Sequence, residues 1–128
     1  MDYSIPLSGL KLQSLRVSVS ANNIVNAGSV DSGKLPERVP FTPSRVNAVS
    51  SDPGVRGTVS QLSSGVPLSQ TGQASSFAEI FSATGVNIEQ ELVNQKLAVT
   101  AYKANATVVR TFSELEETLL DTFANHED

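Results

Sequence analysis

Few side chains in this sequence are suited to catalysis. The chain contains one histidine, His126, and no cysteine, so thiolate metal sites and disulfides are excluded. Residues near a chain end are usually mobile, and we therefore do not expect His126 to act as a catalytic base or a metal ligand. Ser8 and Lys11 have the spacing of a Ser-x-x-Lys nucleophile, but this spacing is also typical of a first helical turn with an exposed lysine, which is the interpretation we favour.

Other common reaction centres are also missing. Most acidic residues lie in the last third of the chain, where they are expected to form a solvated helix face rather than a catalytic pair. The segment Gly54 to Gly57 lacks the length and the following helix of a phosphate-binding loop. The formal net charge is −4, without a basic patch interleaved with aromatic residues, so nucleic acid is not an expected partner. We predict a protein that is not an enzyme and has neither cofactor nor metal.

Several asparagines are placed where they could instead support recognition. Asn94 and Asn105 lie inside a long stretch with helical periodicity, although asparagine is a poor former of helix interiors. On a seam between helices one asparagine can fix the register, whereas on a solvent face it would have no role. The pair Asn22 and Asn23 has two similar interpretations, a bond to a partner element or a frayed helix end.

The stretch that carries Asn94 and Asn105 is predicted to be one long helix within residues 86–128. Asn87 and Gln90 have the spacing of an N-cap and its capping-box partner. Apolar residues then follow at steps of three and four, interrupted at Gln95, which is typical of an amphipathic helix about 50 Å long. Such a helix exceeds what a small domain can cover, so most of one face must find a partner elsewhere.

A second helix is predicted within residues 1–28. Ser4 is expected to cap it and Pro6 suits its first turn, while Gly28 suits a left-handed position after its end. One apolar stripe runs along it, and further residues widen the apolar face to one side. The stripe consists of Leu10, Val17, Ala21 and Ile24, and the extension consists of Leu12, Leu15 and Val19.

Residues 29–85 form an insert that is rich in Ser, Thr, Gly and Pro and supports only a small core. The turn signal Asp52-Pro53-Gly54 separates two alternating segments, 45–49 and 55–59, which predicts a short β-hairpin. Gly57 is expected to weaken the second strand or mark a bulge, and 77–81 predicts a helical turn. The expected fold is mainly α with a small β/loop insert. Its long N- and C-terminal helices form an antiparallel coiled-coil pair with apolar stripes left over for self-association into a helical tube.

Two sequence blocks, one near each end, match a known pattern. The first is Ser8-Gly9-Leu10 followed by residues 16–27, which include an Ala-Asn-Asn-Ile-Val-Asn run. The second comprises residues 86–94 and the run Ala101-Tyr102-Lys103-Ala104-Asn105-Ala106. Together they resemble the bacterial flagellar axial proteins, the family of rod, hook and hook-associated subunits. The sequence departs from that pattern at Val25, at Leu92 and across 95–100.

The resemblance implies a structural subunit of the flagellar basal body, and the short insert points to the proximal rod. Such subunits polymerise through their terminal helices and transmit torque from the membrane ring to the distal rod and hook. Expected partners are copies of the chain, other rod proteins, and membrane-ring and export-apparatus proteins. The rod crosses the periplasm, and its subunits pass through the flagellar type III export channel without a cleaved signal peptide. This fits the absence of a cleavable signal pattern and of an apolar run long enough to span a membrane.

We predict that the apolar stripes of both helices make the assembly contacts. These contacts are Leu10, Leu15, Val17, Ile24, Ile88, Leu92, Val99, Tyr102, Val109 and Leu119, with Asn23 and Asn105 setting the register. An alternative function is a small dimeric binding module, in which the long helix forms a discrete coiled coil that presents the insert to a ligand.

Overall fold

A computed structural model describes residues 2–30, 40–62 and 77–126 of the chain. In chain order the elements are α1 (Ser4–Val25), β1 (Ser44–Ser50), β2 (Val55–Gln61), α2 (Phe77–Thr84) and α3 (Ile88–Ala124). The described part is therefore mainly helical with one small two-stranded antiparallel sheet, as the sequence predicts. Among these residues, no helix has both the length and the apolar character that crossing a membrane requires.

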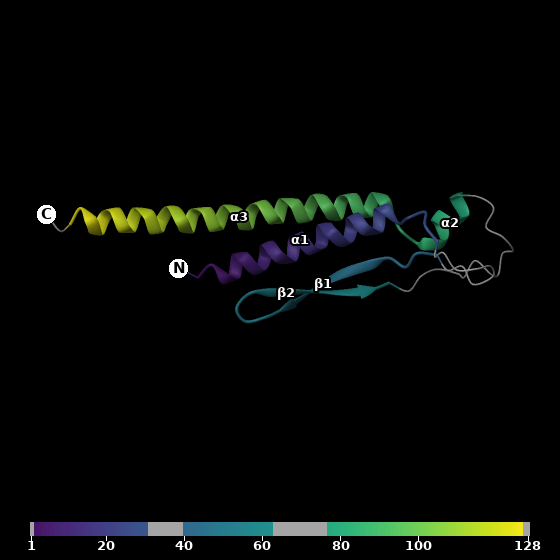
Figure 1. The fold of residues 1–128 in the computed structure, drawn as a ribbon, viewed down its shortest axis with the longest axis horizontal. Coiled ribbons are helices and arrows are strands. Elements are labelled where there is room, and N and C mark those ends of the chain that lie inside the picture. Colours follow the sequence, from purple (N-terminus) through teal and green to yellow (C-terminus); the bar gives the residue numbers. More distant parts are fainter. Residues whose placement is uncertain (1, 31–39, 63–76, 127–128) are drawn as a thin grey trace.

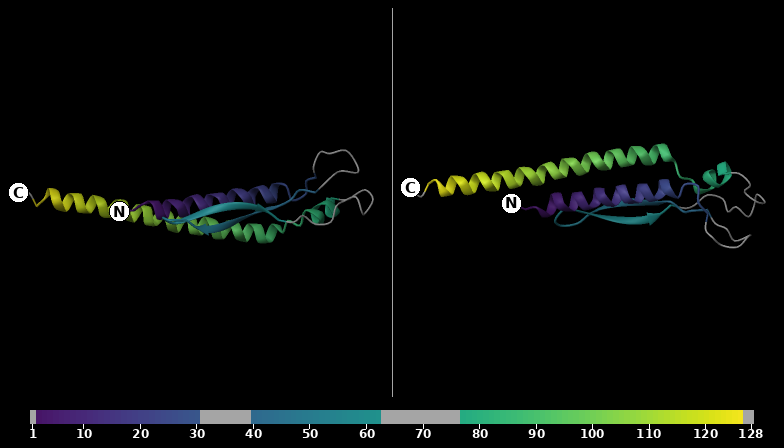
Figure 2. Two further views of the ribbon diagram at one scale, coloured as in Figure 1. Left: turned by 90° about the horizontal axis from the view of Figure 1, so that it is seen from below. Right: turned by 45° about the horizontal axis from the view of Figure 1, so that its top comes forward.

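The elements form three layers along one axis (Figure 1), with α1 between α3 and the β1–β2 hairpin. The helices α1 and α3 run antiparallel and lie side by side in every view (Figure 2). Because α1 has 22 residues and α3 has 37, the C-terminal part of α3 extends past the start of α1. The short helix α2 lies at the opposite end of the molecule.

The start of α3 is set by local side-chain chemistry. The Asn87 side chain accepts a hydrogen bond of 2.9 Å from the Gln90 backbone N–H, and Glu89 and Glu91 occupy the first turn. This confirms the predicted N-cap, because the side-chain oxygen satisfies an amide that has no partner within the helix. The Gln90 side chain does not complete the capping box, and its Nε2 donates to Asn94 Oδ1 at 3.2 Å.

Both predicted ends of α1 need correction. Ser4 is the first helical residue rather than the cap, and the Asp2 carboxylate accepts hydrogen bonds from its backbone N–H and its hydroxyl. These two bonds lower the pKa of Asp2, because they stabilise the charged carboxylate. The helix ends at Val25, and Gly28 is not among the glycines with positive φ. The C-cap is Asn26, whose backbone N–H and side-chain amide both donate to the Asn22 carbonyl, at 3.1 Å and 2.9 Å.

The predicted hairpin is confirmed. Its register pairs Val46 with Val59 and Ala48 with Gly57, and it continues without a bulge from one end to the other. The absence of a side chain at Gly57 has another reason, because a Cβ atom there would lie 2.8 Å from Leu15 Cδ2 of α1. Glycine therefore lets the hairpin pack closely on α1.

The core is small and follows α1. Buried apolar residues include Leu12, Ala27, Val86 and Ala98. Polar side chains share this interior, and Asn23 and Thr84 are the largest fully buried side chains of the described residues. A core of this size covers α1 well and leaves much of α3 exposed.

Candidate assembly interface

Asn23 joins all three layers of the molecule. Its Nδ2 donates to the Ser44 carbonyl at 2.8 Å and to Glu91 Oε1 at 2.7 Å, and its Oδ1 accepts from the Ser44 N–H at 2.9 Å. The side chain is 1% exposed, so these bonds satisfy an amide that would otherwise be costly to bury. Asn23, which was predicted to set register in an assembly, is thus engaged within its own chain.

The contact between α1 and α3 recurs every seven residues along α3. The Ser20 hydroxyl donates to the Glu91 carbonyl at 2.9 Å, and Ala98 is 3% exposed. Gly9 is buried at the next position, where a Cβ atom would lie 2.7 Å from Asn105 Oδ1. Asn105 therefore lies against α1 at a point where only glycine leaves room for it.

The start of α1 contacts α3 at Phe112, which continues the seven-residue series, and at Glu116. The rings of Tyr3 and Phe112 meet edge to face with centroids 5.7 Å apart, and the Tyr3 hydroxyl donates to Glu116 Oε2 at 2.8 Å. That hydrogen bond lowers the pKa of Glu116 and raises the pKa of Tyr3, since it stabilises the carboxylate and retains the phenolic proton.

Ser8 of the Ser-Gly-Leu block fixes the turn of the hairpin. Its Oγ donates to the Ile5 carbonyl at 2.7 Å and accepts from the Val55 N–H at 3.1 Å. Gly54 has φ +104°, and a Cβ atom there would overlap Ser8 Oγ. Ser8 thus has a structural partner, which supports the non-catalytic interpretation of the Ser8–Lys11 spacing.

The predicted contacts on α1 separate into two groups. Leu15 lies against Gly57 and belongs to the packing of the hairpin. Leu10, Val17 and Ile24 are half-buried, and their seven-residue spacing places them on one flank of α1. Since Leu12 and Leu15 face the hairpin and Gly9 faces α3, this flank is the side of α1 turned away from the hairpin.

The predicted contacts on α3 largely lie on the matching flank. Ile88 and Val109 are half-buried, whereas Leu92, Val99 and Tyr102 are exposed, Leu92 by 53%. In two antiparallel helices these positions lie on the same side as Leu10, Val17 and Ile24. We call this surface the open face, and it consists of Leu10, Val17, Ile24, Ile88, Leu92, Val99 and Tyr102.

A second apolar flank of α3 was missed by the sequence analysis. Leu97, Val108 and Leu115 are exposed, Leu97 by 65%, and they lie on the hairpin side of the α1–α3 pair. From Leu97 the apolar residues Ala101, Ala104, Val108 and Leu115 follow at steps of four, three, four and seven. This helical spacing is the sequence signal that could have identified the second flank. Past the start of α1, Leu119, Leu120 and Phe123 are exposed by 53%, 69% and 65%. We call residues 117–124 the projecting end.

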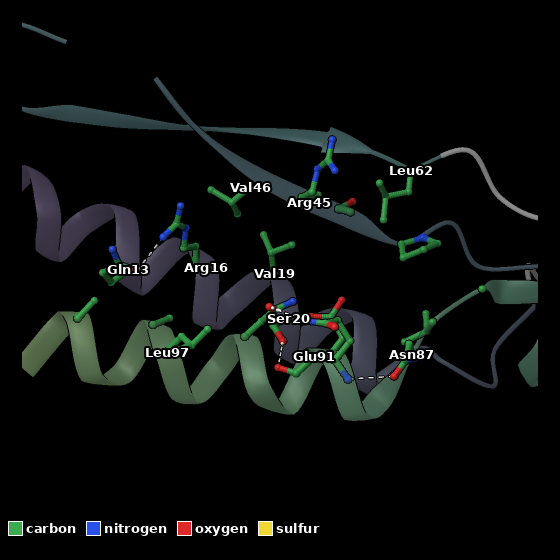
Figure 3. Close-up of a pocket in the computed structure, with 18 residues that line it drawn as sticks. Gln13, Arg16, Val19, Ser20, Arg45, Val46, Leu62, Asn87, Glu91 and Leu97 are labelled. Atoms are coloured by element: carbon green, nitrogen blue, oxygen red, sulfur yellow. Dashed lines mark hydrogen bonds between the residues drawn. The ribbon is translucent and has the colours of Figure 1, made fainter. Parts of the chain in front are cut away.

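A groove of about 670 Å³ opens on the hairpin side, between β1, α1 and the first half of α3 (Figure 3). Its apolar lining includes Val19, Val46, Leu62 and Leu97, and its charged residues are Arg16, Arg45 and Glu91. The Glu91 carboxylate is held by the Asn23 amide at 2.7 Å, and Arg16 donates to Gln13 Oε1 at 3.3 Å.

The described residues contain no cluster of side chains that could hold a metal ion, and His126 is exposed in the turn after α3. No protein-family model matches the chain, and no curated protein is significantly similar to it.

Proposed function

We propose that the chain is a structural subunit of the bacterial flagellar rod, most similar to the FlgC type of proximal rod protein. Its terminal helices would polymerise into a helical tube that transmits torque from the membrane ring to the distal rod and hook. The observation that carries this proposal is the exposure of apolar side chains along α3, from Leu92 to Phe123. Exposed apolar surface of this extent usually marks an interaction site.

The arrangement of α1 and α3 supports the proposal further. Their contacts recur at positions 91, 98, 105 and 112 of α3, the seven-residue repeat of coiled coils. The two flanks of α3 beside this seam are apolar as well, so each subunit could pack helices of its neighbours on both sides. Each leucine fully buried in this way contributes about 1.5–3 kcal/mol.

The first test uses the bacterium that produces the chain. Deleting the gene should abolish swimming, and basal bodies viewed by electron microscopy should lack a rod. A deletion strain that swims normally would remove the basis for the rod proposal.

The second test addresses the open face. Replacing Leu92 and Val99 by glutamate should prevent rod assembly while export of the chain continues, because charges cannot be buried on an apolar seam. Thr100→Glu, on the far side of α3 from α1, is the control and should leave swimming unchanged. Normal swimming of the Leu92 and Val99 variant would show that the open face is not a seam.

Sedimentation of the purified chain distinguishes the rod subunit from the alternative, a dimeric binding module. A discrete helical dimer that persists at low concentration would favour that module. Reversible growth into larger species as the concentration rises would favour the rod subunit, because a heterologous contact repeats without closing.

A further inference from the structure

We propose that the groove between α1, β1 and α3 binds the projecting end of α3 from a second copy of this chain. The inference rests on the proposed function. It specifies which two surfaces of the subunit bind each other in one of the contacts between copies. Its elements are the groove of about 670 Å³ and the three exposed residues Leu119, Leu120 and Phe123.

The groove and the projecting end have matching apolar surfaces. The groove presents Val19, Val46 and Leu97 from three different elements (Figure 3). The projecting end has no α1 beside it, since α1 begins opposite Phe112 and Glu116. Its apolar side chains are therefore available to enter a groove as the buried face of a helix.

A chain cannot fill its own groove with this segment. Leu97 and Phe123 belong to the same continuous helix, Ile88–Ala124, and at 1.5 Å per residue they are about 40 Å apart. A helix cannot fold back on itself over that distance while it remains a helix. The occupant must come from another molecule.

The charges of the two surfaces are complementary. The projecting end contains no lysine or arginine, and its charged residues Glu117 and Asp121 are both acidic. The groove carries Arg16 and Arg45, and neither forms an ion pair within the described residues. Its carboxylate, Glu91, accepts a hydrogen bond from Asn23. An acidic helix end therefore suits two guanidinium groups that have no carboxylate partner among the described residues, which favours this occupant over a neutral or basic helix.

The contact is heterologous, because the groove and the projecting end are different parts of the molecule. Each copy offers a groove to one neighbour and an end to another, so the contact extends into an open array. A closed dimer would require both surfaces of two copies to meet at once.

Cross-linking of the full-length chain tests the contact. The chain has no cysteine, so an L97C chain mixed with an F123C chain has only the two introduced thiols. Upon mild oxidation we expect their mixed disulfide in a yield about tenfold above that of a T100C and F123C mixture, because a formed contact raises the effective concentration of the two thiols. Thr100 is exposed on α3 close to Leu97 along the axis but outside the groove.

A charge exchange provides the second measurement. R16E/R45E should weaken assembly about tenfold, and mixing this chain with an E117K/D121K chain should restore the contact between them. Circular dichroism establishes that each variant folds. Equal yields from the two cysteine mixtures, or absence of recovery in the charge exchange, would overturn the groove contact. If the unmodified chain still assembles in that case, the rod proposal stands. If the chain neither assembles nor cross-links and its deletion leaves swimming intact, both proposals fail.

Discussion

Helices α1 and α3 both have apolar stripes, but their surroundings differ. The hairpin covers one side of α1 and α3 covers another, and small or polar residues of α1 make the closest contacts. Along α3 the only residue classed as buried is Ala98, and large apolar side chains are exposed from one end to the other. The same helical periodicity thus marks an interior element in one case and a surface for partners in the other.

Because of this difference, we expect substitutions on α1 and on α3 to affect two different quantities, the stability of the single chain and its association with other copies. Substitutions at the contacts of α1 should change the free energy of unfolding of the single chain, because their partners lie in the same molecule. Substitutions on the flanks of α3 should change association and leave the folded chain almost unaffected.

The largest effect is expected for Asn23→Ala. The substitution removes a buried amide and leaves the Ser44 N–H and the Glu91 carboxylate without their partner, which should lower the free energy of unfolding by about 2–3 kcal/mol. Urea denaturation measures this change. Asn22→Ala is the matched control, since Asn22 is exposed, and should lower it by less than about 0.5 kcal/mol. Similar losses for both variants would contradict a bracing role for Asn23.

A smaller effect is expected for Gly9→Ala. The new methyl group would meet the Asn105 side chain at 2.7 Å, and the cost of overpacking exceeds the gain in helix propensity. We expect a net loss of about 1 kcal/mol of unfolding free energy in urea denaturation. Asn105→Ala added to Gly9→Ala should recover most of it, because it removes the atoms that clash. A double variant less stable than Gly9→Ala would contradict the proposed close contact.

Substitutions on the flanks of α3 should have still less effect on stability. Leu97→Ser replaces a side chain that is 65% exposed and should change the free energy of unfolding by less than about 0.5 kcal/mol. Sedimentation at high concentration should nevertheless show reduced association. Leu12→Ser is the contrasting variant, since Leu12 is 5% exposed, and it should destabilise the single chain. A loss of stability in Leu97→Ser equal to that in Leu12→Ser would contradict the distinction between the helices.

The smallest effect is expected at Tyr3, and it should be largest between the titrations of Glu116 and Tyr3 and vanish at either extreme of pH. The hydrogen bond from Tyr3 lowers the pKa of Glu116 from its ordinary value of 4.5, so its contribution is present above that pH and is lost as the pH falls through the folded-state pKa. The same bond raises the pKa of Tyr3 from 10.0, and that contribution is lost as the pH rises. Tyr3→Phe should remove the dependence at high pH and weaken the one at low pH, because Tyr3 is the largest of several causes of the Glu116 shift.

Nuclear magnetic resonance titration of the Glu116 carboxyl provides the measurement. In Tyr3→Phe the pKa of Glu116 should move back toward its ordinary value, because the largest cause of its shift is gone. Glu116→Gln is the companion variant, which keeps an acceptor for the Tyr3 hydroxyl. An unchanged Glu116 pKa in Tyr3→Phe would show that another group causes the shift.

Local chemistry in the sequence predicts much of the fold. The Asn87 cap, the Asp52-Pro53-Gly54 turn and the apolar spacing of α3 each depend on neighbours within a few residues, and the structure contains the predicted elements. The glycine motif expected at Gly28 is absent, because α1 already ends at Val25 with Asn26 as its C-cap.

Which element covers which apolar face could not be predicted from the spacing. Leu12 and Leu15 were recognised as an extension of the apolar face of α1, but periodicity does not identify the hairpin as their partner. The same holds for Asn23, whose bonds reach Ser44 and Glu91, far away in the sequence. On α3, a single stripe was traced through Leu92 and Val99, so the other flank with Leu97 and Leu115 was overlooked.

The long-range bonds of α1 also determine the order in which the chain can fold. The β1–β2 hairpin joins segments a few residues apart, whereas the bond from Tyr3 to Glu116 joins positions separated by 113 residues. Closing so long a loop is slower and entropically more costly than closing a hairpin turn. During synthesis α1 and the hairpin leave the ribosome before α3 does. The contact of α1 with α3 is therefore the last of its two contacts that can form.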